Sequence, residues 1–353
     1  MTENILNDIK SIVGTIIADG ATGTNYFSKG LETGDPPELW NILKPEYVSS
    51  LHKEFIEAGS NIILTNSFGG TSCRLKLHNE EKNVYSINKK AAQIAKDAAL
   101  KFRTDQHCEI LVAGSVGPTG ELFEPLGELT IQKGTEIFYE QAKALKDGGA
   151  DLLWIETLSS LDEVDAALNG AEKAGINSAI TMSFDTAKRS MMGVTPQDFV
   201  NHVCGRSYKP IAIGANCGVG PAELIVSLKE LKSALPEDIL LIAKGNCGIP
   251  EFFNDEIIYK GTTQLMAKYA ILSRDAGADI IGGCCGTTSE HIKAIRDAVD
   301  TENALFAWPS IPFHKNTKVS FNRIKDELGI PWKNLDDQNE NLGRVKRKRR
   351  LKR

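Results

Sequence analysis

Three of the seven cysteines lie in short glycine-rich segments that could bring their sulfur atoms together. Cys217 belongs to the segment GANCGVGP, and Cys284 and Cys285 are adjacent in the segment GGCCGTT. Flanking glycines let the backbone turn sharply, so the three thiols could face one point. Three thiolates suit a tetrahedral Zn²⁺ with one open position, whereas a closed structural site would need a fourth ligand at C-x₂-C-type spacing. The spacing alone leaves redox chemistry or simple packing open as alternatives.

A zinc ion with an open position could activate a sulfur nucleophile. A coordinated thiol is deprotonated near neutral pH, so a substrate thiol would become a thiolate without a protein base. Three anionic ligands leave little positive charge on the metal, which keeps the bound sulfur nucleophilic. Hydrolysis by zinc-bound hydroxide is the alternative, but hydrolytic sites more often use His and carboxylate ligands, and no His ends a predicted strand here. The residues therefore favour alkylation of a thiol.

The remaining cysteines are weaker candidates for chemistry. Cys73, Cys108 and Cys204 are expected to be small apolar packing residues. Cys247 follows a predicted strand in the segment GNCGIP and stays open as a further ligand. A vicinal disulfide would be strained, and an odd number of cysteines is typical of a reducing compartment. A cytoplasmic location is therefore predicted.

A repeated pattern of helix, glycine and short apolar run predicts the elements that position these thiols. Each run ends in polar residues, and connections of this kind join parallel strands to helices. The eight predicted strands are Thr15–Gly20, Asn61–Phe68, Glu109–Gly117, Asp151–Thr157, Ser178–Phe184, Pro210–Cys217, Ile239–Asn246 and Asp279–Cys285. Eight strand–helix units predict a (β/α)₈ TIM barrel, an α/β fold whose active sites lie at the carboxyl ends of the strands.

The barrel pattern does not cover the whole chain of 353 residues. We predict a barrel domain over residues 1–300, an extended C-terminal arm over 301–343, and a basic, disordered tail over 344–353. The tail holds eight basic residues and no acid; without these eight charges, the net charge of −5 becomes −13 for the rest of the chain. No run of about 18 apolar residues is present, so no membrane span is predicted.

Several motifs together resemble the homocysteine S-methyltransferase family. They are DGATGT at 19–24, LTNSFGG at 64–70, GPTGELFEPLGELT at 117–130, the Glu of WIET, GANCGVGP and GGCCGTT. The resemblance implies a zinc-containing barrel, and an expected homo-oligomer, that transfers a methyl group to homocysteine and gives methionine. It implies that Cys217, Cys284 and Cys285 bind the zinc. It also implies that Glu156 holds the homocysteine amino group.

The same resemblance places Asp19 and Gly20 at the homocysteine site. An ammonium group needs a fixed acid, and backbone N–H groups in a glycine-rich turn can bind a carboxylate. We therefore predict Glu156 and Asp19 as catalytic residues that orient the amino acid, with Gly20 and Asn216 in the substrate site. Helix N-capping is the alternative role for Asp19.

The methyl donor is predicted from an aromatic residue. The segment GLETGDPPELWN, which contains Trp40, resembles bacterial betaine-type members of the family. An aromatic face can bind a quaternary ammonium group with about 0.5–2 kcal/mol. Trp40 could supply that face, with Phe68 or Phe123 nearby, so betaine is the predicted donor and dimethylglycine the second product.

Two alternatives for the function stay open. The animal betaine enzymes carry a Tyr in the loop where this chain has Gly69 or Gly70, so S-methylmethionine or a methylcorrinoid is an alternative donor. A distant alternative is nucleic-acid or anion binding through the basic tail. The acidic body and the lack of interleaved aromatic residues argue against a nucleic-acid partner.

Overall fold

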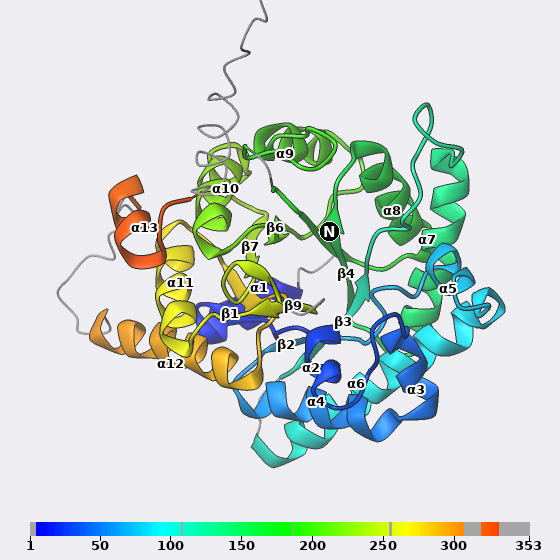
Figure 1. Ribbon diagram of the computed structural model, residues 1–353, viewed down its shortest axis with the longest axis horizontal. Helices are drawn as coiled ribbons and strands as arrows, with labels where there is room; N and C mark the ends of the chain where they lie inside the picture. The colour runs from blue at the N-terminus through cyan, green and yellow to red at the C-terminus, as the bar shows by residue number, and fades with distance from the viewer. Residues whose placement is uncertain (1–4, 107–108, 186, 254–255, 307–318, 332–353) are drawn as a thin grey trace, which may run out of the picture.

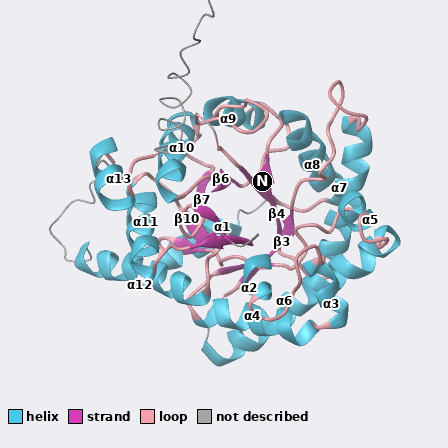
Figure 2. Ribbon diagram, viewed as in Figure 1, coloured by secondary structure: helices cyan, strands magenta, loops and turns pink. Residues whose placement is uncertain are grey.

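The computed structural model describes residues 5–106, 109–185, 187–253, 256–306 and 319–331. Eight parallel strands lie in the middle of the molecule, and helices surround them (Figure 1; Figure 2). The strands are β1 (Ile16–Ile17), β2 (Ile62–Leu64), β3 (Leu111–Val116), β4 (Leu152–Leu158), β5 (Ser178–Met182), β6 (Ala212–Cys217), β7 (Leu240–Gly245) and β10 (Ile280–Gly283). Each overlaps one of the predicted strands.

The first and second strands close the ring. The strand order is β1-β10-β7-β6-β5-β4-β3-β2. At the seam, the Asn61 N–H donates to the Ile17 carbonyl at 2.7 Å, and the Asp19 N–H donates to the Ile62 carbonyl at 3.0 Å. This pairing confirms the predicted (β/α)₈ TIM barrel.

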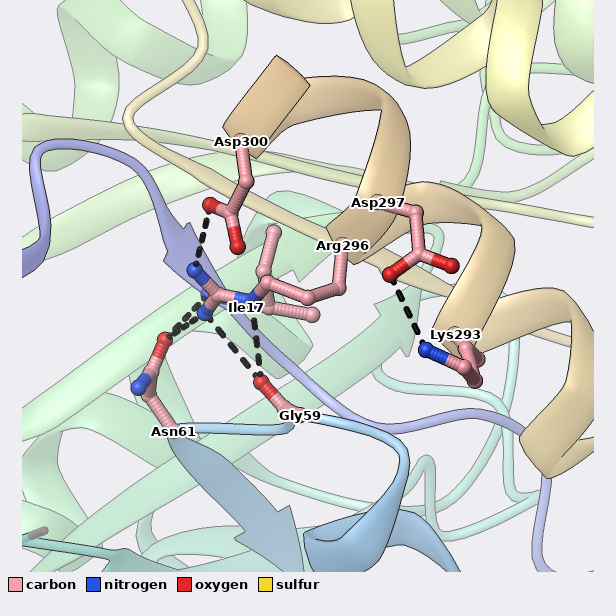
Figure 3. A network of polar contacts seen from close by, with 7 residues as sticks. All are labelled: Ile17, Gly59, Asn61, Lys293, Arg296, Asp297 and Asp300. Carbon is pink, nitrogen blue, oxygen red and sulfur yellow. Dashed lines mark hydrogen bonds and ion pairs between the residues drawn. The ribbon is translucent and has the colours of Figure 1, made fainter. Parts of the chain in front are cut away.

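A helix and its side-chain contacts also secure the seam at the amino-terminal end of the strands (Figure 3). Asn61 Oδ1 accepts a hydrogen bond from the Ile17 N–H at 3.0 Å. Arg296, on α12, donates to the Gly59 carbonyl and to the same Asn61 oxygen. The side chain of Asn61 therefore joins β1, the start of β2 and an outer helix.

The long helices cover the ring from outside, and the short helices lie in the segments that lead from a strand to the next long helix. They are α2 (Gly23–Phe27), η1 (Pro37–Leu39), α3 (Trp40–Leu43), α4 (Pro45–Glu57), α5 (Ser72–Lys76), η2 (Glu81–Asn83), α6 (Val84–Gln106), α7 (Ile131–Asp147), α8 (Leu161–Ala174), α9 (Pro196–Cys204), α10 (Pro221–Ala234), α11 (Thr263–Asp275) and α12 (Ser289–Phe306). Several of them begin after a Ser or Thr whose oxygen accepts a backbone N–H of the first turn, as Thr130, Ser160 and Thr262 do. Such caps satisfy backbone donors that the helix itself leaves without a partner.

The inside of the ring is apolar at the amino-terminal end and polar at the carboxyl end. Helix α1 (Ile5–Val13) covers the amino-terminal opening, where its Leu6 and Ile9 pack with Ile16, Leu152 and other inward strand residues. Inward positions at the other end carry acids, amides, a lysine and thiols. The fold therefore buries its stabilising contacts at one opening and leaves the other for chemistry.

A short antiparallel hairpin after β7 was not predicted. Its strands are β8 (Pro250–Phe253) and β9 (Glu256–Tyr259). The Gly261 N–H donates to the Cys247 carbonyl, and the Cys247 N–H donates to the Cys285 carbonyl at 2.9 Å. The hairpin therefore begins and ends beside the segment that follows β10.

The chain beyond the barrel is described in part. Helix α12 extends to Phe306, past the predicted barrel boundary at residue 300. Helix α13 (Phe321–Leu328) packs on α10 and α11, and Arg323 forms an ion pair with Asp275 at 2.6 Å. The rest of the predicted arm, 307–318 and 332–343, and the basic tail, 344–353, lie outside the described residues. Within the described part of the chain, no helix is long and apolar enough to cross a membrane.

Candidate metal and substrate site

The fold brings the three predicted thiols together at the carboxyl end of the strands. Cys217 is the last residue of β6, and Cys284 and Cys285 directly follow β10. The three sulfur atoms all lie within 4.8 Å of one another. Cys217 has a φ of 59°, which is uncommon for a residue with a side chain and accompanies functional sites. The backbone at the end of β6 is thus bent to point this sulfur at the other two.

The donor set of this cluster fits a soft cation. Hydrogen bonds from Cys217 and Cys284 lower the pKa of Cys285, whereas hydrogen bonds to Cys284 and Cys285 raise the pKa of Cys217. Without a cation the cluster concentrates its negative charge on one sulfur, because like charges at this distance oppose one another. A metal ion would allow all three to ionise, and three thiolates from two strands leave one tetrahedral position open. The role of these residues as ligands remains a prediction.

The other cysteines lie in different surroundings. Cys247 is buried after β7. Among the described residues, the sulfur atoms close enough together to share a metal ion are those of Cys217, Cys284 and Cys285, without that of Cys247. Cys73 and Cys204 are half-buried on α5 and α9. Cys108 lies outside the described residues.

Next to the thiols, three charged side chains are buried in one layer. Asp19 is 1%, Lys244 2% and Glu156 7% exposed. Lys244 Nζ donates to Asp19 Oδ1 at 2.9 Å, and the Leu64 N–H donates to Asp19 Oδ2 at 2.7 Å. Glu156 Oε1 accepts from the Ser115 hydroxyl at 2.6 Å. The two predicted acids therefore share their layer with a lysine that the prediction did not include.

The charges of this layer influence one another. Burial raises the pKa of Asp19 and raises that of Glu156 to about 7. Burial lowers the pKa of Lys244, but the charges of Asp19 and Glu156 outweigh this effect and raise its pKa overall. The lysine therefore remains charged at neutral pH, and Glu156 is poised between its two protonation states.

Asn216 holds Glu156 in an unusual strand conformation. The register between β4 and β5 shifts between Ile155 and Leu158, and Thr157 has a φ of 65°. Asn216 Oδ1 accepts from the Thr157 N–H at 2.9 Å, and Asn216 Nδ2 donates to the Thr157 hydroxyl at 2.7 Å. A bulge changes the direction of a side chain, and here the amide holds the bulge that carries Glu156. Asn216 Nδ2 also lies 3.8 Å from Cys284 Sγ.

Gly20 occupies a tight position beside Asp19. A Cβ atom there would lie 2.6 Å from the Thr287 carbonyl oxygen and 2.8 Å from the Phe55 ring. Any larger residue would force the turn after β1 to move. The sequence prediction that Gly20 belongs to the substrate site is therefore compatible with its surroundings and remains a prediction.

The residue predicted to bind the donor, Trp40, packs within the protein. It is 5% exposed, its ring centroid lies 4.8 Å from that of Tyr26 and 5.4 Å from that of Tyr47, and Lys44 Nζ lies 4.4 Å from the ring. Its aromatic surface is thus already in contact with protein groups. Phe68, by contrast, is 38% exposed in the loop after β2. The donor role of Trp40 remains a prediction without a supporting contact.

Two residues near the thiols were missed by sequence reasoning. Lys244 ends the apolar run LLIAK, and a lysine near the carboxyl end of the predicted strand Ile239–Asn246 could have indicated an inward charge. Tyr259 of β9 hydrogen-bonds to Cys285, which lowers the pKa of that thiol. A Cβ atom at Gly286 would lie 2.3 Å from Tyr259 Cβ, so the hairpin packs directly on the thiol segment.

Comparison with known structures supports the same fold. The metallated form of the homocysteine methyltransferase MmuM from Escherichia coli matches with a TM-score of 0.69 and 24% identity, over 83% of this chain and 99% of that chain. Its oxidized form matches with a TM-score of 0.68, 24% identity and coverage of 83% and 98%. A methyltransferase from Methanosarcina mazei matches with a TM-score of 0.53 and 14% identity, over 85% of this chain and 98% of that chain. At these identities the likeness concerns the fold.

A family model extends the likeness from fold to family. The model described as homocysteine S-methyltransferase matches residues 16–299, from β1 through the thiol segments and into α12. The matched range contains both acids, Lys244 and the three clustered cysteines. The chain therefore belongs to the homocysteine S-methyltransferase family, as the resemblance of its motifs implies.

Proposed function

We propose that this enzyme transfers a methyl group from a small onium donor to the sulfur of homocysteine, which gives methionine. The observation that carries this proposal is the placement of three thiols within 4.8 Å of one another beside two buried acids. Cys217, Cys284 and Cys285 would hold a zinc ion. When bound, zinc would keep the substrate thiol ionised at neutral pH.

The buried acids would orient the amino acid. Glu156 Oε1 is occupied by the Ser115 hydroxyl, which holds the carboxylate in one orientation while its other oxygen can accept the homocysteine ammonium group. The turn that contains Gly20 would bind the carboxylate through backbone N–H groups. Asn216 would maintain the bulge that presents Glu156.

The reaction step joins an anionic nucleophile to a cationic donor. The homocysteine sulfur forms a bond to the methyl carbon, and the bond from that carbon to the onium nitrogen or sulfur breaks with its electron pair. A neutral amine or thioether centre then leaves. Because opposite charges neutralise in this step, a site that excludes water favours it.

Betaine is the donor predicted from the sequence, with dimethylglycine as its product. A quaternary ammonium group needs an aromatic face, and the exposed ring of Phe68 is better placed to supply one than the packed ring of Trp40. Phe123 is buried. Phe68 is therefore the first donor-site residue to test.

S-methylmethionine is the second candidate donor, favoured by the loop after β2. A Cβ atom at Gly70 would lie 2.3 Å from Asn88 Oδ1, and one at Gly69 would lie 2.9 Å from Glu38 Oε1. The loop therefore has no room for the aromatic side chain that the animal betaine enzymes carry there. A donor that depends less on an aromatic cage suits this loop better.

A donor panel tests the proposal. Zinc-loaded protein and homocysteine are incubated separately with methyl-deuterated betaine, S-methylmethionine or methylcobalamin, and labelled methionine is quantified by mass spectrometry. Labelled methionine from betaine or S-methylmethionine identifies the donor, with the Cys285→Ala variant as the inactive control. Methionine formed only from methylcobalamin would replace the onium donor by a corrinoid. Absence of labelled methionine with all three donors would refute the proposed function.

The remaining expectations concern the whole protein. We propose the domain division at residues 300 and 343, a cytoplasmic location and a homo-oligomer, on the arguments from the sequence. Helix α13 lies against the barrel of its own chain, which supports the idea that the arm packs on the barrel. Light scattering of the purified protein tests the oligomeric state.

A further inference from the structure

Lys244 lies in the middle of the site but has no part in the proposed reaction. It is the inward residue near the end of β7, and its register partners are Asn216 on β6 and Gly282 on β10. Its ammonium group lies 2.9 Å from Asp19 Oδ1 and 5.6 Å from the centre of the Trp154 ring. Lys244 is 2% exposed, so its ammonium group has lost nearly all its hydration. Burial of a charge has a large free-energy cost, which a functional role of Lys244 would explain.

Stability alone is a poor reason for this lysine. Replacing a buried ion pair by apolar residues of similar size is often neutral or stabilising, because the desolvation of two charges offsets their attraction. The surrounding strands already supply an apolar interior, with Trp154 and Ile242 in the same cluster. A methionine at position 244 would fill the space without a buried charge.

The charges around Lys244 provide the reason. When both acids are ionised, Asp19 and Glu156 carry two negative charges in one buried layer, and the lysine carries one positive charge. The three side chains together therefore present one net negative charge. The homocysteine ammonium group carries one positive charge, so the bound substrate would neutralise the layer. Without the lysine, the two acids would oppose each other's ionisation in a site that excludes water.

We propose that Lys244 is a positioning residue for homocysteine, which holds the Asp19 carboxylate and balances one of the two acids, so that the site accepts one ammonium group. This inference rests on the proposed function. Lys244 holds Asp19 Oδ1 while the Leu64 N–H holds Oδ2, so both oxygens of this carboxylate are restrained. Glu156 has a hydroxyl partner and no cationic hydrogen-bond partner among the described residues, and it is the acid that receives the ammonium group.

The test compares two ligands that differ only by the ammonium group. Homocysteine and 4-mercaptobutanoate share the thiol and the carboxylate, so the ratio of their dissociation constants isolates recognition of the ammonium group. Calorimetric titration of the zinc-loaded protein gives this ratio without any methyl donor. Zinc content, measured with a chromogenic chelator, and the melting temperature show whether each variant retains its metal and its fold.

In Lys244→Met, the charge of Asp19 opposes the ionisation of Glu156 and no lysine offsets it, so Glu156 is protonated more often. The ratio is therefore expected to fall at least about tenfold, equivalent to about 1.4 kcal/mol of ammonium recognition. The double variant Asp19→Asn with Lys244→Met again has one net negative charge, on Glu156. It is expected to recover the ratio to within about threefold of the wild type, a difference below 1.4 kcal/mol. Lys293→Met, which removes an exposed lysine paired with Asp297, is the matched control and should leave the ratio unchanged.

Two outcomes would overturn the proposal. Lys244→Met could retain the wild-type ratio, either with both affinities unchanged or with both weakened equally, as for a purely structural residue. The double variant could also fail to recover the ratio, which would exclude charge balance as the role of Lys244. If the wild-type protein itself binds neither ligand, the proposed function fails and the inference falls with it. A wild type that distinguishes the ligands, together with an unaffected Lys244→Met, refutes the inference alone.

Discussion

The two ends of the barrel each hold a cation that joins distant parts of the chain, but the partners of the two cations differ. At the amino-terminal end, Arg296 donates to the Gly59 carbonyl and to Asn61, and it pairs with the exposed Asp300 (Figure 3). At the carboxyl end, Lys244 pairs with one buried acid while a second buried acid lies close by.

The difference separates a structural network from a binding network. Arg296 and its partners satisfy one another: two neutral acceptors and one carboxylate surround one guanidinium. With both acids ionised, the buried layer of Asp19, Glu156 and Lys244 at the other end retains one negative charge after its internal pairs are formed. A buried network with an unbalanced charge has a cost for folding, and such costs are typical of functional sites. The comparison predicts that substitutions at the two ends change different measured quantities.

The largest effect is expected from the thiols. Cys285→Ala removes one of three ligands, so it should abolish stoichiometric zinc binding and reduce methionine formation at least about a thousandfold, beyond the loss typical of one transition-state interaction. Zinc content and product by mass spectrometry measure both effects. Cys73→Ser, on α5, is the matched control and should retain both. Full zinc content and activity in Cys285→Ala would contradict the three-thiolate site.

Glu156→Gln is expected to have the next largest effect on activity. The amide cannot pair with the ammonium group as a charge, so kcat/KM for homocysteine should fall about a hundredfold, equivalent to about 2.7 kcal/mol. Since the pKa of Glu156 is about 7, wild-type affinity should rise as the pH increases from 6 to 8 and the carboxylate forms. Any rise in affinity that remains in Glu156→Gln comes from ionisation of the homocysteine thiol. Identical pH profiles would show that Glu156 does not bind the ammonium group.

The same substitution should stabilise the protein. Burial raises the pKa of Glu156 from 4.5 to about 7, so the folded protein binds this proton more tightly than the unfolded chain. This carboxyl therefore destabilises the fold progressively as the pH rises through that interval, by up to about 3 kcal/mol. Glu156→Gln should raise the free energy of unfolding at pH 8 and have little effect at pH 4. Urea unfolding at both pH values measures the difference, and a loss of stability at pH 8 would contradict it.

Arg296→Met should change stability and leave catalysis intact. It removes the hydrogen bonds to the Gly59 carbonyl and to Asn61, so the free energy of unfolding should fall by about 1–3 kcal/mol. The kinetic constants for homocysteine should stay within about twofold, a change well below 1 kcal/mol. Lys293→Met, on the same helix and paired with the exposed Asp297, is the control for stability. A large change in the KM for homocysteine would contradict a purely structural role for the Arg296 network.

Trp40→Phe is expected to have the smallest effect on activity, and it tests whether Trp40 belongs to the donor site. Because Tyr26, Tyr47 and Lys44 contact the Trp40 ring, the change should raise the donor KM less than about threefold, below 1 kcal/mol. Phe68→Ala should raise it more, because that ring is exposed. Steady-state kinetics with the donor that the panel identifies measure both. The reverse order would restore Trp40 as the donor-binding residue predicted from the sequence.

The elements that local sequence determines were predicted well. Six of the eight strands follow a helix end and a Gly-containing connection, and this signal lies within a few residues of the strand itself. The connections before β3 and β7 contain no Gly, and those two strands were predicted from their apolar runs. The proximity of Cys217 to Cys284 and Cys285 follows from the same pattern, because parallel strands place their carboxyl ends on one face. The β8–β9 hairpin was missed because its two antiparallel strands lie between β7 and α11 and interrupt the repeat of strand and helix on which the prediction depends.

The contacts that depend on closure of the ring could not be predicted. Lys244 meets Asp19 only because β7 and β1 flank β10, and no local pattern in the sequence links the two residues. The surroundings of Trp40 likewise depend on Tyr26, which precedes it on another helix. The sequence identifies an aromatic or charged side chain, but its contacts in the folded protein determine whether that side chain is available to a ligand.

The pairing of β1 with β10 has a consequence for biosynthesis. Ile16 of β1 pairs with Ile280 of β10. β1 is synthesised first and β10 last, so β1 can pair on both sides only after β10 has left the ribosome. Contacts between such distant residues form late in folding. Cys284 and Cys285 follow that last strand, and Cys217 belongs to β6. Uptake of a metal ion by all three thiols therefore requires that β10 has paired with β7 beside β6. Metal content reports whether the last strand of a newly made chain has joined the barrel.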